Sequence, residues 1–263
     1  MKRIASLTLT IAMLISVMLL CSSCFSIYRY DNAEKYSVGG ATISDHVSKI
    51  DIGWVAGEVR IEAYDGDVIT FREDTTYELE EKRQLHYLLD GTTLYLQYAK
   101  SGIANKNTGF GEKNLIVMIP NDRAYDLDIE TVSSDIYIDA QNDFNEIDIE
   151  TVSGYSRINI NNSNTIDFET VSGNVSISMY SCAAPCKIDS VSGNVELLLN
   201  RENGFVLEYE TVSGILESEV ATQQTMGQFI YTGTEAHGIM NRFEIETVSG
   251  NVDIFSSSAH PHN

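Results

Sequence analysis

The residues best suited to chemistry in this sequence are acids that recur at fixed places in a repeated motif. One set stands directly before a recurring Thr or Ser, at Glu130, Glu150, Glu169, Asp189, Glu210 and Glu246. A second set stands two positions earlier, at Asp128, Asp148, Asp167, Glu208 and Glu244, with Lys187 in place of an acid in one copy. Carboxylate oxygens are the ligands that hard cations such as Ca²⁺ prefer.

Two interpretations of these acids stay open. The first is a calcium ladder, whose ligands would be Glu130, Glu150, Glu169 and Asp189. The second is a solvated acidic face that keeps the protein soluble, with salt screening the repulsion between neighbouring carboxylates. Regular columns lack the converging carbonyl oxygens of a dedicated calcium loop, which favours the second interpretation.

Other candidates for catalysis are few. The histidines show no metal-ligand spacing on a structured element; they are His46, His86, His237, His260 and His262. The sequence has neither a G-x-S-x-G elbow nor a G-x-x-x-x-G-K-[ST] loop. The repeated serines are better explained as corner residues that hydrogen-bond the backbone; they are Ser133, Ser153, Ser172, Ser192, Ser213 and Ser249. We expect no catalytic residue and no cofactor, and a polysaccharide-active β-helix enzyme stays as an alternative.

Two cysteines, Cys182 and Cys186, lie close together in "SCAAPC". An exported chain can keep such a pair oxidised, so a disulfide is one expectation. The alternative is that Cys186 is a small buried apolar residue, because other copies of the motif have Leu, Ile or Phe at its position.

The N-terminus has the layout of an export signal. Lys2 and Arg3 precede an apolar run over residues 4–20, and "CSSC" follows at once. This resembles a bacterial lipobox, so we expect residues 1–23 to be a signal peptide and Cys24 to carry the lipid. An uncleaved membrane anchor is the alternative, since the run is near the lower length limit of a spanning helix. Either way the rest of the chain would be extracytoplasmic and anchored to the cell membrane, facing outward.

The elements that must position these residues are short strands. From Val47 onward apolar and polar residues alternate with period two, which indicates an all-β chain. The Thr or Ser of the motif recurs at 131, 151, 170, 190, 211 and 247, in steps of 20, 19, 20, 21 and 36. Such spacing predicts a single-stranded parallel β-helix or solenoid over residues 47–255 with coils of about 20 residues, roughly ten in number. Right-handed winding is the general preference of parallel crossovers.

Each copy predicts two buried strand positions before a tight corner and two after it. The corner glycines, expected to adopt positive φ, are Gly154, Gly173, Gly193, Gly214 and Gly250. A degenerate earlier copy, "IDIGWVAGEVRI", has Trp54 at the Thr position and Gly57 at the corner. The long last step predicts either an extra coil or a hairpin excursion over residues 217–242. We expect residues 24–46 to be a tether and residues 256–263 to be disordered.

The charge balance limits the class of partner. The chain has 38 acidic and 17 basic residues and a formal net charge of -21. A nucleic-acid-binding protein needs clustered Lys and Arg to displace counterions from phosphates, so we expect no nucleic-acid partner. Cations or cationic surfaces are the electrostatic partners that such a charge favours.

The T-V-S-G corners, the "LIVMIP" strand before the first of them, and the lipoprotein-type leader together resemble the DUF4097 family of adhesin-like β-repeat proteins. The resemblance extends over about residues 47–255. It implies a β-solenoid on the cell envelope and offers no established catalytic residues. We therefore expect a noncatalytic envelope lipoprotein that acts in adhesion, with the membrane, a glycan or an envelope protein as partner. An envelope-stress sensor that regulates a membrane protein is the alternative.

Overall fold

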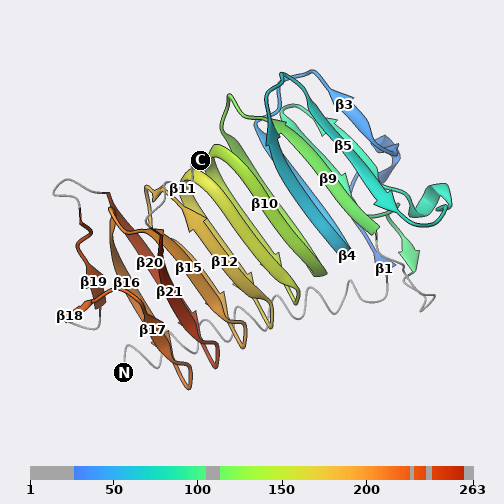
Figure 1. Cartoon of the computed structure of the whole chain (residues 1–263). Helices are drawn as coiled ribbons and strands as arrows, with labels where there is room; N and C mark the ends of the chain where they lie inside the picture. The colour runs from blue at the N-terminus through green and yellow to red at the C-terminus, as the bar shows by residue number, and fades with distance from the viewer. Residues whose placement is uncertain (1–26, 105–112, 226–227, 235–238, 258–263) are drawn as a thin grey trace.

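The computed structural model describes residues 27–104, 113–225, 228–234 and 239–257, and these form a long stack of β-strands (Figure 1). Two short 3-10 turns, η1 (Ala33–Lys35) and η2 (Glu81–Arg83), are the only helical elements of the described residues. The predicted all-β class is confirmed. The predicted signal peptide with Cys24, and residues 258–263 of the predicted tail, lie outside the described residues. The tail was predicted to be disordered from residue 256, but Ser256 and Ser257 are paired strand residues.

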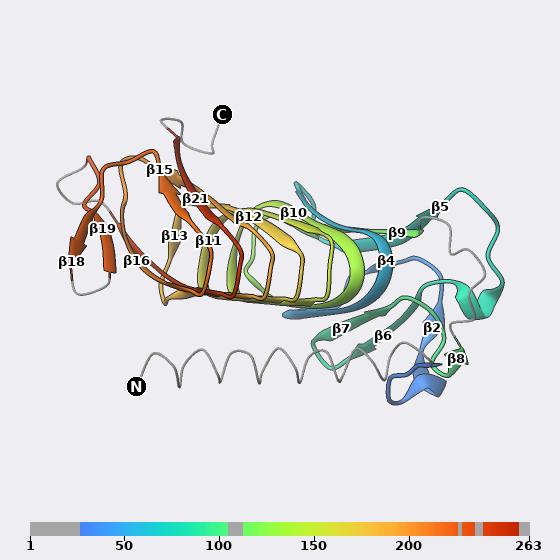
Figure 2. The same cartoon turned by 90° about the horizontal axis from the view of Figure 1, so that it is seen from below.

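Eight layers make up the stack. In the layers of the repeats one strand enters the corner and a second strand leaves it, and seen from below these strands bend around the core like a flattened hoop (Figure 2). We call the side built by the entering strands the first face and the side built by the leaving strands the second face. Strands of neighbouring layers pair in parallel on both faces.

The first three layers, in spatial order, are β7 (Thr93–Gln97) with β9 (Lys113–Pro120), then β4 (Lys49–Tyr64), then the first half of β10 (Tyr125–Thr151). The next two are the rest of β10 with the start of β11 (Tyr155–Thr170), and the end of β11 with β12 (Asn174–Met179). The last three are β14 (Cys186–Ser190) with β15 (Val195–Asn200), β20 (Met240–Thr247) with β21 (Val252–Ser257), and β16 (Gly204–Thr211) with β17 (Leu216–Ser218). The short strand β13 (Ser181–Cys182) pairs with β11 beside this stack.

The alternation of apolar residues builds the core between the two faces. From the first face, fully buried side chains come from Ile129, Ile149, Phe168, Ile188 and Ile245. From the second face they come from Ile138, Ile158, Ile177, Leu197 and Ile254. A single layer could not bury these side chains, so each layer depends on its neighbours for the roughly 25 cal/mol per Å² that apolar burial contributes.

The register confirms the alignment of repeats made from the sequence. Thr151 pairs with Thr170, Thr170 with Ser190, and Ser190 with Thr247. The degenerate copy is also in register, because Trp54 pairs with Thr131 and Gly57 with Ser134. Equivalent residues of successive layers therefore lie beside each other.

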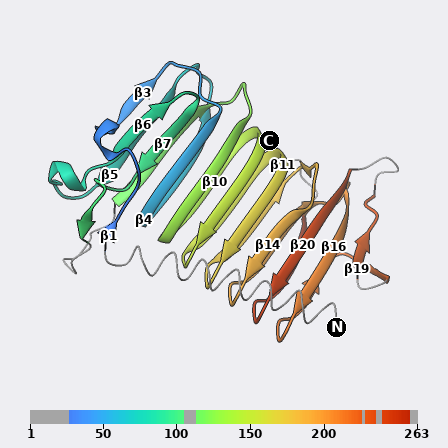
Figure 3. The same ribbon diagram turned by 180° about the vertical axis from the view of Figure 1, so that it is seen from behind.

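The last repeat does not occupy the end of the stack. Phe243 of β20 pairs with Cys186 of β14 on one side and with Leu207 of β16 on the other. Figure 3 shows β20 between β14 and β16. The chain thus forms the terminal layer from β16 and β17 first. The strands that follow in sequence, β20 and β21, then form the layer between this terminal layer and the layer of β14 and β15.

A hairpin explains the long step that precedes this insertion. Strands β18 (Gln223–Thr225) and β19 (Gln228–Tyr231) pair antiparallel with each other, and β19 pairs antiparallel with β16. Of the two alternatives for residues 217–242, an extra coil or a hairpin excursion, the antiparallel pairing supports the hairpin. The insertion of the following coil was not predicted.

Antiparallel strands cover the opposite end of the stack. On the first face β6 (His86–Asp90) pairs with β7, and β2 (Ser37–Val38) pairs with β6. On the second face β5 (Ile69–Thr75) pairs with β9, and β3 (Ala41–Ile43) pairs with β5. A separate pair joins β1 (Ile27–Tyr28) to β8 (Ile103–Ala104).

This N-terminal cap corrects two expectations. Residues 24–46 were expected to form a tether, but β2 and β3 are paired strands of the cap. About ten coils were expected, but the described residues form eight layers. The difference arises because residues 65–92 and 217–231 form mainly the antiparallel strands at the two ends of the stack and the connections between them.

The corners are held by a repeated set of hydrogen bonds. In four copies the Thr or Ser side chain accepts a hydrogen bond from the glycine N–H three residues later, as at Thr170 with Gly173 (2.8 Å) and Thr247 with Gly250 (2.7 Å). The corner serine donates its hydroxyl to a valine carbonyl of the adjacent layer at 3.2–3.3 Å in every copy. The prediction that these serines bond the backbone is confirmed.

The expected positive φ of the corner glycines is wrong for most of them. Among the predicted five, Gly154 has positive φ (114°), while the other four do not. The reason for glycine at those four is close stacking. A Cβ at Gly193 would overlap the Gly173 carbonyl oxygen, and one at Gly250 would overlap that of Gly193.

Candidate functional site

The acids singled out in the sequence form two parallel columns on the outer surface of the first face. Alternate residues of the entering strands point inward to the core, so the residues between them point outward. Column A, in spatial order, contains Asp51, Asp128, Asp148, Asp167, Lys187, Glu244 and Glu208. Column B contains Glu130, Glu150, Glu169, Asp189, Glu246 and Glu210.

Crowding of these carboxylates opposes their ionisation. Burial, and then the neighbouring acids, raises the pKa of Asp51, Asp148 and Asp189 to about 6 and that of Glu169 to about 7. The pKa values of Glu130, Glu150 and Asp167 are also raised, mainly by burial. Parallel strands lie about 4.8 Å apart, where two carboxylates repel by roughly 0.9 kcal/mol in water and by more at a lower effective dielectric.

Two lysines of the chain lie in or beside the columns. The Lys49 ammonium lies 2.8 Å from a carboxylate oxygen of Asp128. Lys187 lies in column A between Asp167 and Glu244 and lowers the pKa of Asp167 against the effect of burial. Between the layer of Asp128, which Lys49 binds, and the layer of Lys187 are two layers that contribute two acids each to the columns. These four acids, which we call the carboxylate quartet, are Asp148, Glu150, Asp167 and Glu169.

Glu169 is the most enclosed member of the quartet. Only 8% of its surface is exposed, although its side chain lies on the outer surface. Its register neighbours in column B are Glu150 and Asp189, both acids. Across the described ranges, no hydrogen-bond donor or cation contacts the Glu169 carboxylate.

The predicted calcium ligands Glu130, Glu150, Glu169 and Asp189 are therefore brought together in column B. Within the described part of the chain, however, no three His, Cys, Asp or Glu side chains are placed to hold one metal ion. Calcium binding by the column stays a prediction, and it would require the side chains to move together.

The two cysteines are free thiols and are buried, so the structure has no disulfide between them. Cys182 donates weakly to the Asn164 carbonyl, with sulfur and oxygen 3.7 Å apart. Cys186 lies in an apolar position, paired with Ile166 and Phe243, and its burial raises its pKa. This is the alternative in which Cys186 is a small buried apolar residue.

The histidines are not brought together. His86 is buried in β6, its ring contacts the Gln84 carbonyl (2.9 Å), and burial lowers its pKa. His46 lies in the segment before β4. The others, His237, His260 and His262, lie outside the described residues.

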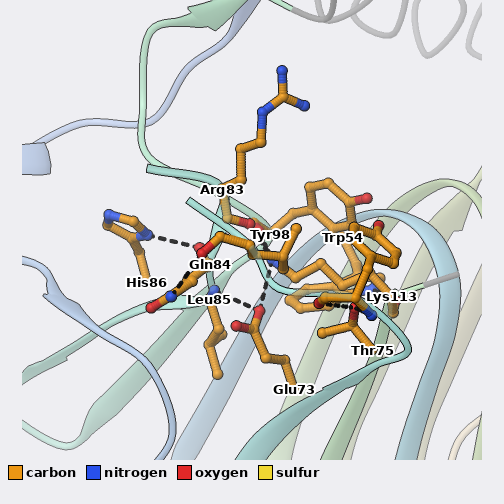
Figure 4. A network of polar contacts seen from close by, with 11 residues as sticks. Trp54, Glu73, Thr75, Arg83, Gln84, Leu85, His86, Tyr98 and Lys113 are labelled. Atoms are coloured by element: carbon orange, nitrogen blue, oxygen red, sulfur yellow. Dashed lines mark hydrogen bonds and ion pairs between the residues drawn. The ribbon is translucent and has the colours of Figure 1, made fainter. Parts of the chain in front are cut away.

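One buried charged network was not predicted. Lys113 is 1% exposed, lies 2.9 Å from Glu73, and donates to the carbonyls of Arg83 (2.7 Å) and Tyr98. Its ammonium also lies over the rings of Tyr98 and Trp54, 4.5 and 5.1 Å from their centroids (Figure 4). Burial lowers the pKa of Lys113 to about 8 against the pull of Glu73. The network joins the cap to the first layers, and its enclosure makes it structural.

The fold and this face together define an all-β, layered solenoid with an acidic outer surface. Residues 140–255 match the family model described as Toastrack DUF4097, which confirms the family resemblance for this part of the chain. Residues 47–139, to which the expected resemblance also extended, lie outside the match but continue the same layers.

One of two similar solved structures supports the fold. A "putative cell adhesion protein" from Clostridium sporogenes has a TM-score of 0.50 at 10% sequence identity, covering 84% of this chain and 100% of that one. A "putative adhesin" from Bacteroides fragilis has a TM-score of 0.34 at 9% identity, covering 82% and 97%. The likeness to the first structure is one of fold. A comparison with curated proteins found no match. Among the described residues, no helix is long and apolar enough to cross a membrane.

Proposed function

We propose that this protein is a noncatalytic binding module of the bacterial cell envelope, carried by a lipid on Cys24 and acting in adhesion. The observation that supports this most is that the hydroxyls of the repeated corner serines are engaged in hydrogen bonds between layers. Each corner serine donates to a carbonyl of the next layer, so the repeats serve to build a rigid stack. What the stack displays to its surroundings is the acidic first face. We also expect its winding to be right-handed.

The name of the structural relative from Clostridium sporogenes supports an adhesive role in the same sense. Adhesion and sensing differ in what they bind. An adhesin binds a glycan or a matrix surface, whereas an envelope-stress sensor binds a membrane protein of its own cell.

The test is binding of the purified full chain to an array of glycans, matrix proteins and envelope polymers. We expect saturable binding to at least one surface and no turnover of it. Crosslinking in cells to a single membrane protein, with no binding on the array, would favour the sensor instead. Release of soluble sugar products from a bound polymer would contradict a noncatalytic role.

A further inference from the structure

We propose that the second face carries a binding site for a neutral polysaccharide, built on the rings of Tyr137 and Tyr155 with Arg157 beside them. We call these three residues the tyrosine patch. The proposal deepens the proposed function, on which it rests, because it names the class of surface to which the module adheres. A charged polymer and a protein are outcomes of the test described below.

The two rings belong to neighbouring layers and point outward. Tyr137 lies between the buried Ile136 and Ile138 of β10, and Tyr155 stands directly before the buried Ser156 of β11. The ring centroids are 6.3 Å apart, and the ring planes are inclined by 59°. Tyr155 is 37% exposed. The second face thus presents two adjacent aromatic rings on its outer surface.

Both tyrosines depart from the pattern of the other layers. At the position of Tyr137, the layers that follow have Arg157, Ser176, Glu196 and Asp253. At the position of Tyr155, the layers before and after it have Asp135, Asn174, Asn194 and Asn251. The repeat therefore does not require an aromatic ring at either position.

Tyr155 also lacks a hydrogen bond that its equivalents make. The side-chain oxygens of Asp135, Asn174 and Asn194 each accept from the backbone N–H of the equivalent residue in the next layer, at 2.8–2.9 Å. The N–H that Tyr155 would have to bond is that of Asn174, and it donates to the Gly154 carbonyl instead (3.1 Å). A hydrogen bond between layers is thus replaced by an exposed ring, which points to a role outside the fold.

Polar groups beside the rings suit the hydroxyls of a sugar. Arg157 is exposed, and its guanidinium makes no hydrogen bond or ion pair with the described residues. Next to it, Asn159 donates to the exposed Asp139 carboxylate at 2.8 Å. A sugar hydroxyl both donates and accepts, so it can bond the guanidinium and the carboxylate together. The apolar side of the same sugar can cover an aromatic ring.

The tyrosine patch is also held in place before any ligand binds. The Arg60 guanidinium carbon lies 4.9 Å from the centroid of the Tyr137 ring, and Arg60 is itself paired with Glu58 at 2.8 Å. The strands that carry these residues, β4, β10 and β11, pair in parallel in one continuous register. Because the rings are already ordered, less entropy is lost when a ligand binds them.

The charges beside the patch favour a neutral ligand. A polyanion would meet the carboxylates of Asp135 and Asp139, which flank Tyr137 on β10. A polycation would be repelled by Arg157 and attracted to the acidic columns of the first face instead. Small molecules bind in concave pockets, whereas this patch lies on the outer surface of a sheet, which suits an extended chain.

The experiment is affinity electrophoresis of the purified full chain in gels that contain laminarin, dextran or galactomannan, which are soluble neutral polysaccharides. We expect saturable retardation by at least one of them. Tyr155→Asn, which restores the residue type of the next layer, should keep the melting temperature and weaken binding by about tenfold or more. The matched control is Tyr77→Asn, because Tyr77 is also 37% exposed but lies between β5 and η2. It should change the affinity by less than about twofold.

An absence of retardation by every neutral polymer would overturn the proposal, as would an unchanged affinity in Tyr155→Asn. Tighter binding of polygalacturonate, lost in Arg157→Gln, would assign the patch to an acidic sugar and overturn the neutral one. Loss of matrix-protein binding in Tyr155→Asn, with no retardation by any polysaccharide, would assign the patch to a protein. Binding on the adhesion array that Tyr155→Asn leaves unchanged would remove this site and leave adhesion standing, so the two proposals are separable.

Discussion

At the scale of single residues, Glu169 is the carboxylate whose ionisation most opposes folding. Its pKa is about 7 in the folded protein, against 4.5 ordinarily, so the folded state holds its proton more tightly than the unfolded state does. Stability should therefore be highest below pH 4.5, as far as this group is concerned, and fall as the pH rises to about 7. Glu169→Gln removes that loss. We expect its melting temperature to exceed that of the wild type at pH 8 and to differ less at pH 5, and an equal difference at both would contradict this account.

Thr247 tests the corner hydrogen bond. Its buried hydroxyl accepts from the Gly250 N–H at 2.7 Å, and Ser190 does the same for Gly193 in the adjacent layer. Thr247→Val leaves that N–H without a partner, which should cost about 1–3 kcal/mol in the free energy of unfolding. Thr247→Ser is the control, because Ser190 shows that serine can make the bond. Urea unfolding measures both, and a loss in Thr247→Val no larger than that in Thr247→Ser would contradict a stabilising role for this hydrogen bond.

At the scale of elements, the buried ion pair of Lys113 and Glu73 fixes the cap strand β5 to β9. Lys113→Met leaves the Glu73 carboxylate without its cation, and we expect a loss of about 3–5 kcal/mol in the free energy of unfolding. Lys82→Met is the control, since its partner Glu80 is exposed. We expect no measurable change there. A similar small effect of both substitutions would show that the network is not what holds the cap.

The glycine corners are also a property of stacked elements. Gly193→Ala would force a Cβ against the Gly173 carbonyl oxygen, and overpacking of this kind costs about 1–3 kcal/mol. Ser192→Ala, in the same corner, removes only an exposed hydrogen bond of 3.3 Å and should cost less. Thermal unfolding of the two variants compares them, and a Gly193→Ala variant as stable as the wild type would show that the layers can separate locally.

The sequence could predict the elements that repeat and the site that they carry. The period-two alternation indicates the strands, and the fixed steps align Trp54 with Thr131 and Glu150 with Glu169, as the register confirms. It could not predict the cap, because residues 65–92 lack the motif and their partners are distant in sequence. The Lys113 network was missed for the same reason. The Glu73 and Lys113 positions are brought together only by the antiparallel pairing of β5 and β9.

At the scale of the whole molecule, the order of layers determines which acids are neighbours on the acidic face. The copy at residues 243–250 has the same apolar and acidic pattern as the others, so any position in the stack would bury its core side chains equally well. Only the structure shows that it lies between the copies at 186 and 207. As a result, Asp189 neighbours Glu246 rather than Glu210, and column B continues without interruption to the terminal layer.

The most direct test is oxidative crosslinking of paired cysteines in a background without the native ones. Neighbouring parallel strands place equivalent Cα atoms within the 4.4–6.8 Å that a disulfide allows, whereas strands two layers apart are about 9.6 Å apart. Asp189→Cys with Glu246→Cys should form a disulfide readily. Asp189→Cys with Glu210→Cys should not. The reverse result, with Asp189→Cys joined to Glu210→Cys and not to Glu246→Cys, would contradict the inserted last coil and the acidic face built on it.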